Sequence, residues 1–196
     1  MNKFGIYENG EVIARFAAPM TVRSNTPVFI SESLALTRRI RKSSAQRWEI
    51  DSSLEALNGD ANTLFAHMVL HGMHTPVNVV MPQPVAAIKQ FAGVSPQAVQ
   101  AASPVGQAFV PTDIQVVVGT FIRFSNHSKI YCVMSCLLGG VSIFPSLRKA
   151  VDDTVTISFE DDVIMPAYYD TGTVSGAVFV DGVLMDLGAV KLVEAL

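Results

Sequence analysis

One stretch near the middle of the chain, residues 121–147, constrains the fold more than any other. It reads FIRFSNHSKIYCVMSCLLGGVSIFPSL. Short runs rich in β-branched and aromatic residues are separated by the polar turn Ser125–Ser128 and by the pair Gly139-Gly140. Runs of this length between such turn residues are typical of strands joined by tight turns. The stretch therefore predicts three antiparallel strands in a small sheet or barrel.

The same region is also a candidate for a membrane-spanning helix. Residues 130–147 come close to the ~18 apolar residues that cross a bilayer as a helix. Gly139-Gly140, Pro145 and three serines interrupt the run, which favours the sheet. The first residues, MNKFGIYENGE, lack the continuous apolar core of a signal peptide. We therefore expect a protein that is made in the cytoplasm and does not enter a membrane.

The composition is unusually poor in charge. Hydrophobic residues make up 49% of the chain and charged residues 16%, whereas soluble domains average about 25% charged residues. A surface with so little charge has to expose apolar or uncharged polar groups, and such groups mark interaction sites. The composition favours a subunit that is buried in an assembly.

Two dipeptides predict hairpins, one near each end of the chain. Asn9-Gly10 lies between residues 6–8 and 11–13, and Asp181-Gly182 lies between residues 176–180 and 183–185. These dipeptides favour two-residue hairpin turns because both central residues need positive φ. One more strand is predicted at residues 189–193.

Strand and helix patterns follow each other between residues 34 and 81. Alternation predicts a pair of strands at 34–41 and 47–51, with Trp48 and Ile50 facing a core. Residues 60–63 offer helix N-cap candidates, and Gly72 is a C′ candidate. Between them we expect one short helix that covers the core face of Trp48 and Ile50, and then a strand within residues 75–81. The apolar residues at helical spacing are Leu64, Phe65, Met68 and Val69.

Residues 91–112 contain no charged residue and are mostly Ala, Gln, Ser, Pro, Val and Gly. This composition indicates a linker or loop, which we place at residues 86–112. Strands are then expected at 114–118 and 154–159. The expected fold class is mainly β (α+β), with a domain at 1–85 and a barrel domain at 113–171.

Three histidines are the most evident candidates for a metal site. His67 and His71 would lie one turn apart on the predicted helix, with His74 beyond its end. Two such histidines can bind zinc, but a zinc peptidase helix needs Glu directly after the first, and this chain has Met68. We therefore favour histidines at the surface or boundary of an amphipathic helix, and expect no bound metal.

Other candidates for chemistry are weaker. Asp152-Asp153 and the acidic run 160–162 lack the spacing of a calcium loop, so we interpret them as solvated strand ends. Cys132 and Cys136 lie four apart on a predicted strand, on one face and roughly 13 Å apart, too far for a disulfide. They are expected to be reduced core residues. No nucleophile elbow or phosphate-binding loop is present, so we expect no catalytic residue, no cofactor and no enzyme activity.

The main cluster of positive charge is a candidate for inter-subunit or lumen contacts. On a strand, Arg39 and Arg41 share one face and Arg38 lies on the other. A basic face on a hairpin arm suits a salt bridge between subunits or the wall of a lumen, and a solvated sheet face is the alternative. The cluster consists of Arg38, Arg39, Arg41, Lys42 and Arg47.

Two groups of residues resemble a known family. Residues 43–50, SSAQRWEI, follow a basic strand and precede the predicted helix. They resemble the N-terminal ring domain of tailed-bacteriophage distal tail proteins. Residues 121–131, together with the Ile-x-Pro-x-Leu pattern at 143–147, are similar to the C-terminal OB-like barrel of siphophage distal tail proteins.

The resemblance implies a structural role in a virion. It implies a ring-forming, tube-like domain at residues 1–85, to which residues 172–196 return, with the OB-like barrel inserted between them. It further implies a hexameric ring at the tail tip or baseplate, in contact with the tail tube protein and the hub. DNA would pass through the lumen without specific binding.

Two other functions stay open for the barrel. One is nucleic-acid binding, which needs a basic groove with exposed aromatic residues. Residues 114–165 contain only four basic residues, Arg123, Lys129, Arg148 and Lys149, against five acidic residues within 152–162. The other is carbohydrate binding, for which Tyr168-Tyr169 is the aromatic pair to examine.

Overall fold

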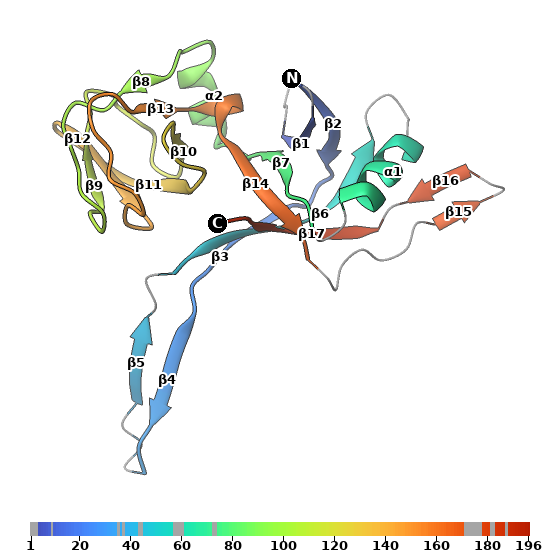
Figure 1. Cartoon of the computed structure of the whole chain (residues 1–196), viewed down its shortest axis with the longest axis horizontal. Helices are drawn as coiled ribbons and strands as arrows, with labels where there is room; N and C mark the ends of the chain where they lie inside the picture. The colour runs from blue at the N-terminus through green and yellow to red at the C-terminus, as the bar shows by residue number, and fades with distance from the viewer. Residues whose placement is uncertain are drawn as a thin grey trace.

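A computed structural model gives the architecture of the chain (Figure 1). The described residues lie mostly in antiparallel strands, with two α-helices, α1 (Ala61–His71) and α2 (Val85–Phe91). The β-rich α+β class predicted from the sequence is confirmed, although only one helix was expected. Neither of these helices has the length and apolar character needed to cross a membrane. The structure describes residues 4–8, 10–34, 36, 38–42, 45–56, 61–71, 74–170, 178–180, 183–186 and 188–196.

Seven strands form the larger sheet, in the order β17-β14-β7-β1-β2-β6-β3. Strand β17 also pairs with β6, so the sheet closes on itself, and the end of the chain lies among strands from its beginning. The long strand β6 pairs with β2 near its end and with β3 near its start. The strands are β1 (Gly5–Glu8), β2 (Glu11–Phe16), β3 (Thr21–Asn25), β6 (Arg47–Ala56), β7 (Val77–Val80), β14 (Ile164–Tyr169) and β17 (Ala189–Glu194).

Both predicted hairpins form. Strands β1 and β2 pair directly, and Gly10 in their turn has φ +92. Strands β15 (Val178–Val180) and β16 (Val183–Asp186) pair in the same way. Asn9, Asp181 and Gly182 lie outside the described residues.

Helix α1 covers the core of the larger sheet, as expected. Leu64 and Met68 are buried in one cluster with Trp48 and Ile50. The inclusion of Val69 in the buried stripe was wrong, because it lies about 100° round the helix from Met68 and is exposed. The cap candidates Asp60 and Gly72 lie outside the described residues.

Six strands form the smaller sheet, in the order β8-β13-β10-β11-β12-β9. The three strands predicted within residues 121–147 are β10, β11 and β12, which lie side by side at its centre. The turn between β11 and β12 needs Gly139, whose φ is +82. The strands are β8 (Gln97–Ala98), β9 (Phe109–Pro111), β10 (Phe121–Phe124), β11 (Ile130–Leu137), β12 (Gly140–Phe144) and β13 (Thr156–Ser158).

The expected linker at residues 86–112 belongs to the smaller sheet. It holds most of α2 together with β8 and β9, and Phe91 stacks on Phe159 with ring centroids 4.4 Å apart. An uncharged run of small residues can build a core when a few large apolar residues anchor it, and here Phe91, Val99 and Val110 are buried. Two further assignments were wrong: residues 114–118 form no strand, and residues 164–169 belong to the larger sheet.

The cysteines of β11 face different cores. Cys132 packs against the larger sheet's core, whereas Cys136 packs against that of the smaller sheet. The expectation of a shared face fails because a bulge between Val133 and Ser135 shifts the register and interrupts the alternation. Both thiols are free and half-buried.

A two-stranded arm extends away from both sheets (Figure 1). It consists of β4 (Val28–Glu32) and β5 (Arg38–Lys42), which pair with each other. The predicted pairing of residues 34–41 with 47–51 was therefore wrong. Leu34 and Leu36 lie in the connection between β4 and β5, where Leu36 has φ +58. Ala35 and Thr37 lie outside the described residues.

Candidate functional site

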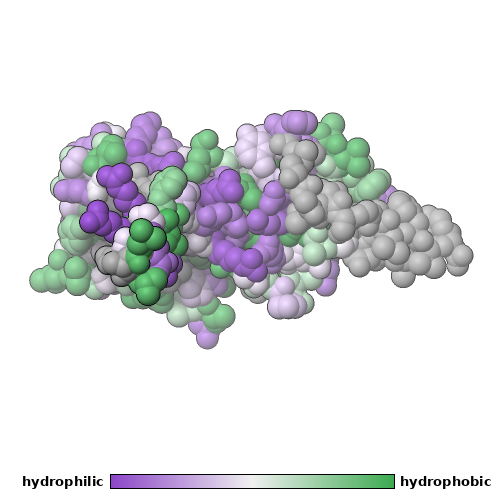
Figure 2. Space-filling model, turned by 90° about the horizontal axis from the view of Figure 1, so that it is seen from below, coloured by the Kyte–Doolittle hydropathy of each residue, from purple (hydrophilic) through white to green (hydrophobic). Residues whose placement is uncertain are grey.

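The arm exposes large apolar side chains on an element that nothing in the described chain covers. Phe29 is 70% exposed, Ile30 53% and Ile40 55%, and Leu34 and Leu36 near the tip are also exposed. Figure 2 looks at the molecule from the side to which the arm points, and hydrophobic and hydrophilic side chains lie next to each other there. An apolar surface of this kind marks a contact with another molecule.

The strand register of the arm determines on which face each charged residue lies. Residues directly opposite in an antiparallel pair share a face. Arg41 lies opposite Phe29 and Arg39 opposite Ser31, so these four residues share one face. Arg38 lies opposite Glu32 on the other face, as the predicted alternation required. Each arginine is exposed, and none forms an ion pair with a carboxylate among the described residues.

The arm differs in charge from the rest of the protein. Residues 28–42 contain four basic residues and one acidic residue, Glu32, which gives the segment a net charge of +3. Because the whole chain carries −3, the remainder carries −6. A basic arm on an acidic protein is complementary to the body of another copy of the same chain.

The arm is also a weak structure when alone. A two-stranded hairpin without a third strand or a hydrophobic face to cover it is at best marginally stable in water. Its outer edges carry backbone groups that a further strand or another chain can pair with. The exposed apolar side chains of the arm, its positive charge and its two-stranded structure all indicate that a partner stabilises it.

Arg47, which the sequence grouped with the arm arginines, belongs to the larger sheet. Its Nε lies 3.4 Å from Glu49 Oε1, and Glu49 is also reached by Lys191 at 3.3 Å and by Asn25 Nδ2 at 2.6 Å. Burial raises the pKa of Glu49, but these hydrogen bonds and positive charges outweigh it and hold the pKa below its usual value. Arg47 is thus engaged within its own chain.

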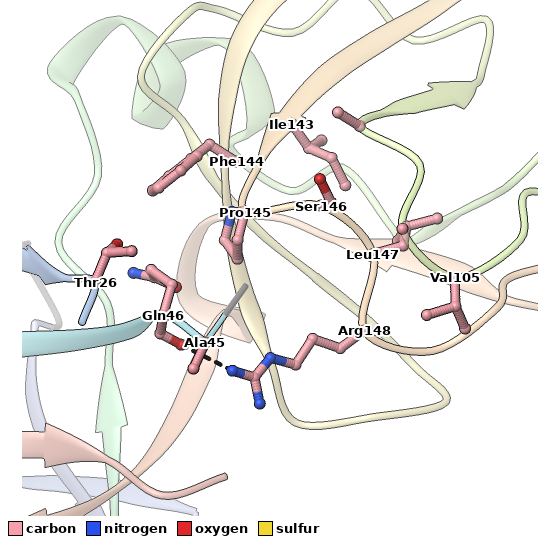
Figure 3. A pocket seen from close by; sticks show the side chains of 12 residues that line it. Thr26, Ala45, Gln46, Val105, Ile143, Phe144, Pro145, Ser146, Leu147 and Arg148 are labelled. Carbon is pink, nitrogen blue, oxygen red and sulfur yellow. Dashed lines mark hydrogen bonds between the residues drawn. The ribbon is translucent and has the colours of Figure 1, made fainter. Parts of the chain in front are cut away.

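A hollow of about 720 Å³ lies where the base of the arm meets the smaller sheet (Figure 3). Pro145, Phe144 and Leu147 line one side of it, and Gln46 and Thr26 line the other. The described lining residues include no carboxylate, imidazole or thiol, and Arg148 is their one charged group.

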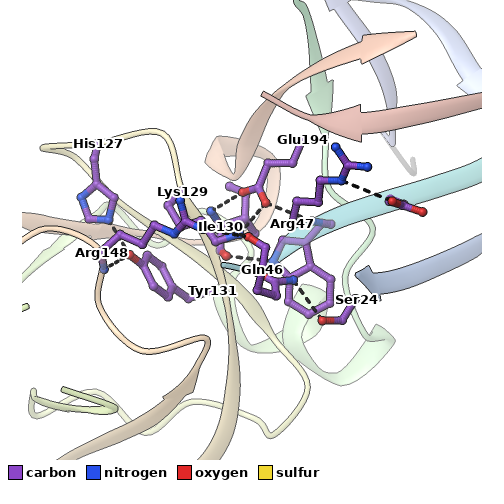
Figure 4. A network of polar contacts seen from close by, with 11 residues as sticks. Ser24, Gln46, Arg47, His127, Lys129, Ile130, Tyr131, Arg148 and Glu194 are labelled. Atoms are coloured by element: carbon purple, nitrogen blue, oxygen red, sulfur yellow. Dashed lines mark hydrogen bonds and ion pairs between the residues drawn. The ribbon is translucent and has the colours of Figure 1, made fainter. Parts of the chain in front are cut away.

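Polar groups fasten the two sheets together beside this hollow (Figure 4). The Glu194 carboxylate pairs with the Lys129 ammonium and accepts hydrogen bonds from the backbone N–H groups of Trp48 and Ile130, each 3.0 Å long. Lys129 Nζ also donates to the Gln46 carbonyl at 3.1 Å. Burial lowers the pKa of Lys129 to about 8, although Glu194 acts in the opposite direction.

Further contacts extend this junction. Trp48 Nε1 donates to the Ile130 carbonyl at 2.8 Å, and its ring meets Phe121 edge-on with centroids 5.1 Å apart. The side-chain amide of Gln83 bonds both backbone groups of Phe121, at 2.9 and 3.0 Å. Arg123 Nη1 donates to the Ile164 carbonyl at 3.0 Å. The described contacts hold the sheets as one body that carries the arm.

Comparison with known proteins gives no match to a family model and no similar sequence among curated proteins. The candidate site therefore rests on the residues themselves. The arm is the described surface on which exposure, charge and lack of covering coincide.

The structure keeps His67 and His71 together and separates His74 from them. His67 is buried, so its assignment to the surface or boundary was wrong, and its ring lies against that of His71 with centroids 4.1 Å apart. His74 is exposed beyond the helix. The fold also brings Glu8 to His67, with Oε2 3.6 Å from Nε2. No local pattern in the sequence could have shown this contact.

The other candidates have internal explanations. Asp152 Oδ1 accepts hydrogen bonds from the backbone N–H and hydroxyl of Thr154, at 3.0 and 2.6 Å, and these bonds lower its pKa. Residues 160–162 form a short 3₁₀ turn. Of the tyrosine pair, Tyr168 is exposed and Tyr169 is buried, so they do not form a two-ring platform for a sugar.

Proposed function

We propose that this protein is a structural subunit of a ring at the tail tip or baseplate of a bacteriophage, in which the arm of each subunit docks on its neighbour. The observation that carries the proposal is the exposed arm with a charge of +3, attached to a body that carries −6. Contacts between different surfaces of identical subunits are heterologous, and they close into a ring when the rotation between subunits allows it.

The assignment to a phage tail draws on the resemblance to distal tail proteins. In this role the ring, a hexamer by that resemblance, joins the tail tube protein to the hub or baseplate proteins. DNA passes through its lumen. The larger closed sheet forms the ring wall, and the smaller sheet is attached to it. The absence of a paired nucleophile and base among the residues that line the described hollow is consistent with a structural role.

The structure gives little support to nucleic-acid binding by the smaller sheet. Two of the four basic residues between 114 and 165 are engaged at the junction, because Lys129 pairs with Glu194 and Arg123 bonds the Ile164 carbonyl. A groove that follows a nucleic-acid backbone needs exposed cations along it. Of the four, Arg148 and Lys149 are exposed, whereas the single strand β5 of the arm exposes three arginines.

The molar mass of the purified chain in solution, with negative-stain imaging, tests the proposal. We expect rings or higher oligomers at high concentration or with tail tube protein present. Arg39→Glu with Arg41→Glu reverses the charge of one face of the arm and should leave monomers. Lys89→Glu, at an exposed position on α2, is the matched control and should assemble normally. A wild-type chain that stays monomeric at every concentration and forms no ring with tube protein contradicts the proposal.

A further inference from the structure

A second cluster of side chains capable of chemistry lies apart from the junction contacts, where His67 of α1 meets Glu8 at the end of β1. His67 and His71 follow each other by one turn of α1, and Glu8 is the last residue of β1. One potential ligand atom from each of these residues lies within 4.8 Å of the other two. Two histidines of one helix and a glutamate distant from them in sequence thus converge on one point.

The donor atoms fit a transition-metal ion. Zinc binds histidine nitrogen and carboxylate oxygen at 2.0–2.2 Å, so ligand atoms around a tetrahedral ion lie about 3.4 Å apart. His67 Nε2 and Glu8 Oε2 are already 3.6 Å apart. The ligand atom of His71 lies within 4.8 Å of both, so it needs to move by at most about 1.4 Å to reach the same spacing. The Glu8 side chain is 39% exposed and can turn to meet an ion.

The two rings carry buried nitrogens without a partner. His67 is 5% exposed at its side chain, and the Nδ1 atoms of both His67 and His71 are buried with no hydrogen bond from the described residues. Buried polar atoms in proteins are nearly always satisfied by protein, water or a bound ion. His67 faces Glu8 through Nε2, so its unpartnered Nδ1 is the ring nitrogen that a metal ion bound at Nε2 leaves for water.

We propose that Glu8, His67 and His71 bind one divalent transition-metal ion, with zinc as the best match to two imidazoles and a carboxylate. Three protein ligands leave one position for water or for a group from another molecule. The ion links the N-terminal hairpin to α1. A zinc peptidase would need Glu at position 68 as its base; the chain has Met68 there, so the site binds metal without that chemistry.

Isothermal titration of tag-free, chelator-treated protein with Zn²⁺ and Co²⁺ tests the site. We expect one ion per chain, visible absorption typical of tetrahedral Co²⁺, and a Tm that rises with metal concentration, because a ligand bound only to the folded state stabilises it. The test variants are Glu8→Gln and His71→Gln, at partly exposed positions. His74→Gln, an exposed histidine close by, is the control.

Each test variant should weaken binding at least about tenfold, as changes to residues that merely hydrogen-bond a ligand already do at metal sites, and should remove the metal-dependent rise in Tm. The control should bind like the unaltered chain. Circular dichroism without metal establishes that the variants are folded. The proposal is overturned if the unaltered chain binds no stoichiometric ion, or if Glu8→Gln and His71→Gln bind as tightly as it does.

Discussion

The Lys129 ammonium and the Glu194 carboxylate form an ion pair buried between the two sheets, with side chains 2% and 0% exposed. Lys129 directly precedes β11 of the smaller sheet, and Glu194 ends β17 of the larger one. Glu194 also accepts backbone hydrogen bonds from both sheets, so its carboxylate, 65 residues from Lys129 in the chain, joins the two sheets.

Replacing one member of this pair should be costly. Lys129→Met leaves the Glu194 charge buried without its counter-ion, and breaking a buried pair in this way costs about 3–5 kcal/mol. Denaturant unfolding followed by circular dichroism measures the loss. Lys149→Met, which removes an exposed lysine in the segment after β12, should stay within about 0.5 kcal/mol of the parent chain. Equal stabilities for the two variants would show that the pair contributes nothing.

Trp48→Phe tests a second contact between the two sheets, the hydrogen bond from Trp48 to Ile130. The substitution keeps an aromatic ring against Phe121 but removes the Nε1 donor and leaves the Ile130 carbonyl short of one hydrogen bond. A loss of about 1–3 kcal/mol is expected for a buried group left unsatisfied. The chain has a single Trp, so unfolding has to be followed by circular dichroism and not by tryptophan fluorescence. An unchanged midpoint contradicts the prediction.

The exposed apolar side chains of the arm should matter for assembly and not for folding. Phe29→Ser removes a ring that is exposed within the subunit, so the free energy of unfolding of the monomer should change by less than about 0.5 kcal/mol. The concentration needed for assembly, measured by light scattering, should rise. Leu138→Ser, at an exposed turn position of the smaller sheet, is the control. Parallel behaviour of the two variants would mean that the arm is not a contact surface.

Added salt should weaken assembly if the arm docks through its arginines. Exposed charges are screened over about 8 Å at physiological ionic strength and over about 3 Å at 1 M. The oligomer fraction, measured by analytical ultracentrifugation, should fall as the NaCl concentration is raised from about 0.05 M to about 0.5 M. The Arg39→Glu, Arg41→Glu variant should lose this dependence. Assembly that strengthens with salt would indicate apolar docking alone.

His127 should make stability depend on pH. Burial lowers its pKa to about 4 from 6.5, with further lowering by the charges of Lys149, Arg123 and Lys129. The neutral ring contacts the Tyr131 hydroxyl through Nε2 at 2.7 Å. Because the folded pKa is depressed, the unfolded chain takes up the proton first. The contribution of the His127 ring to folding stability is therefore complete above pH 6.5 and is lost as the pH falls towards 4.

The variant His127→Gln should flatten the fall in unfolding free energy between pH 6.5 and 4. His67 contributes a fall in the same direction, since its pKa is also lowered, so part of the slope will remain. His74→Gln should leave the profile unchanged, because its ring is exposed. A slope in His127→Gln equal to that of the parent chain would remove His127 as the cause.

Local patterns determined much of the secondary structure. Gly10 follows Asn9 between two alternating runs, and the first hairpin forms there because a tight turn needs positive φ. The central strands of the smaller sheet and the buried face of α1 follow from residue spacing in the same way. The alternation of Arg38, Arg39 and Arg41 on the arm was also readable from the sequence.

Only the tertiary structure decided which distant residues meet. The β17–β6 pairing, the Lys129–Glu194 pair and the approach of Glu8 to His67 carry no local signal, because residues far apart are joined by the burial of shared apolar surface. The bulge in β11 turned Cys136 away from the face of Cys132. Spacing along a chain fixes a side chain's direction within its own element, whereas the packing of elements fixes its neighbours.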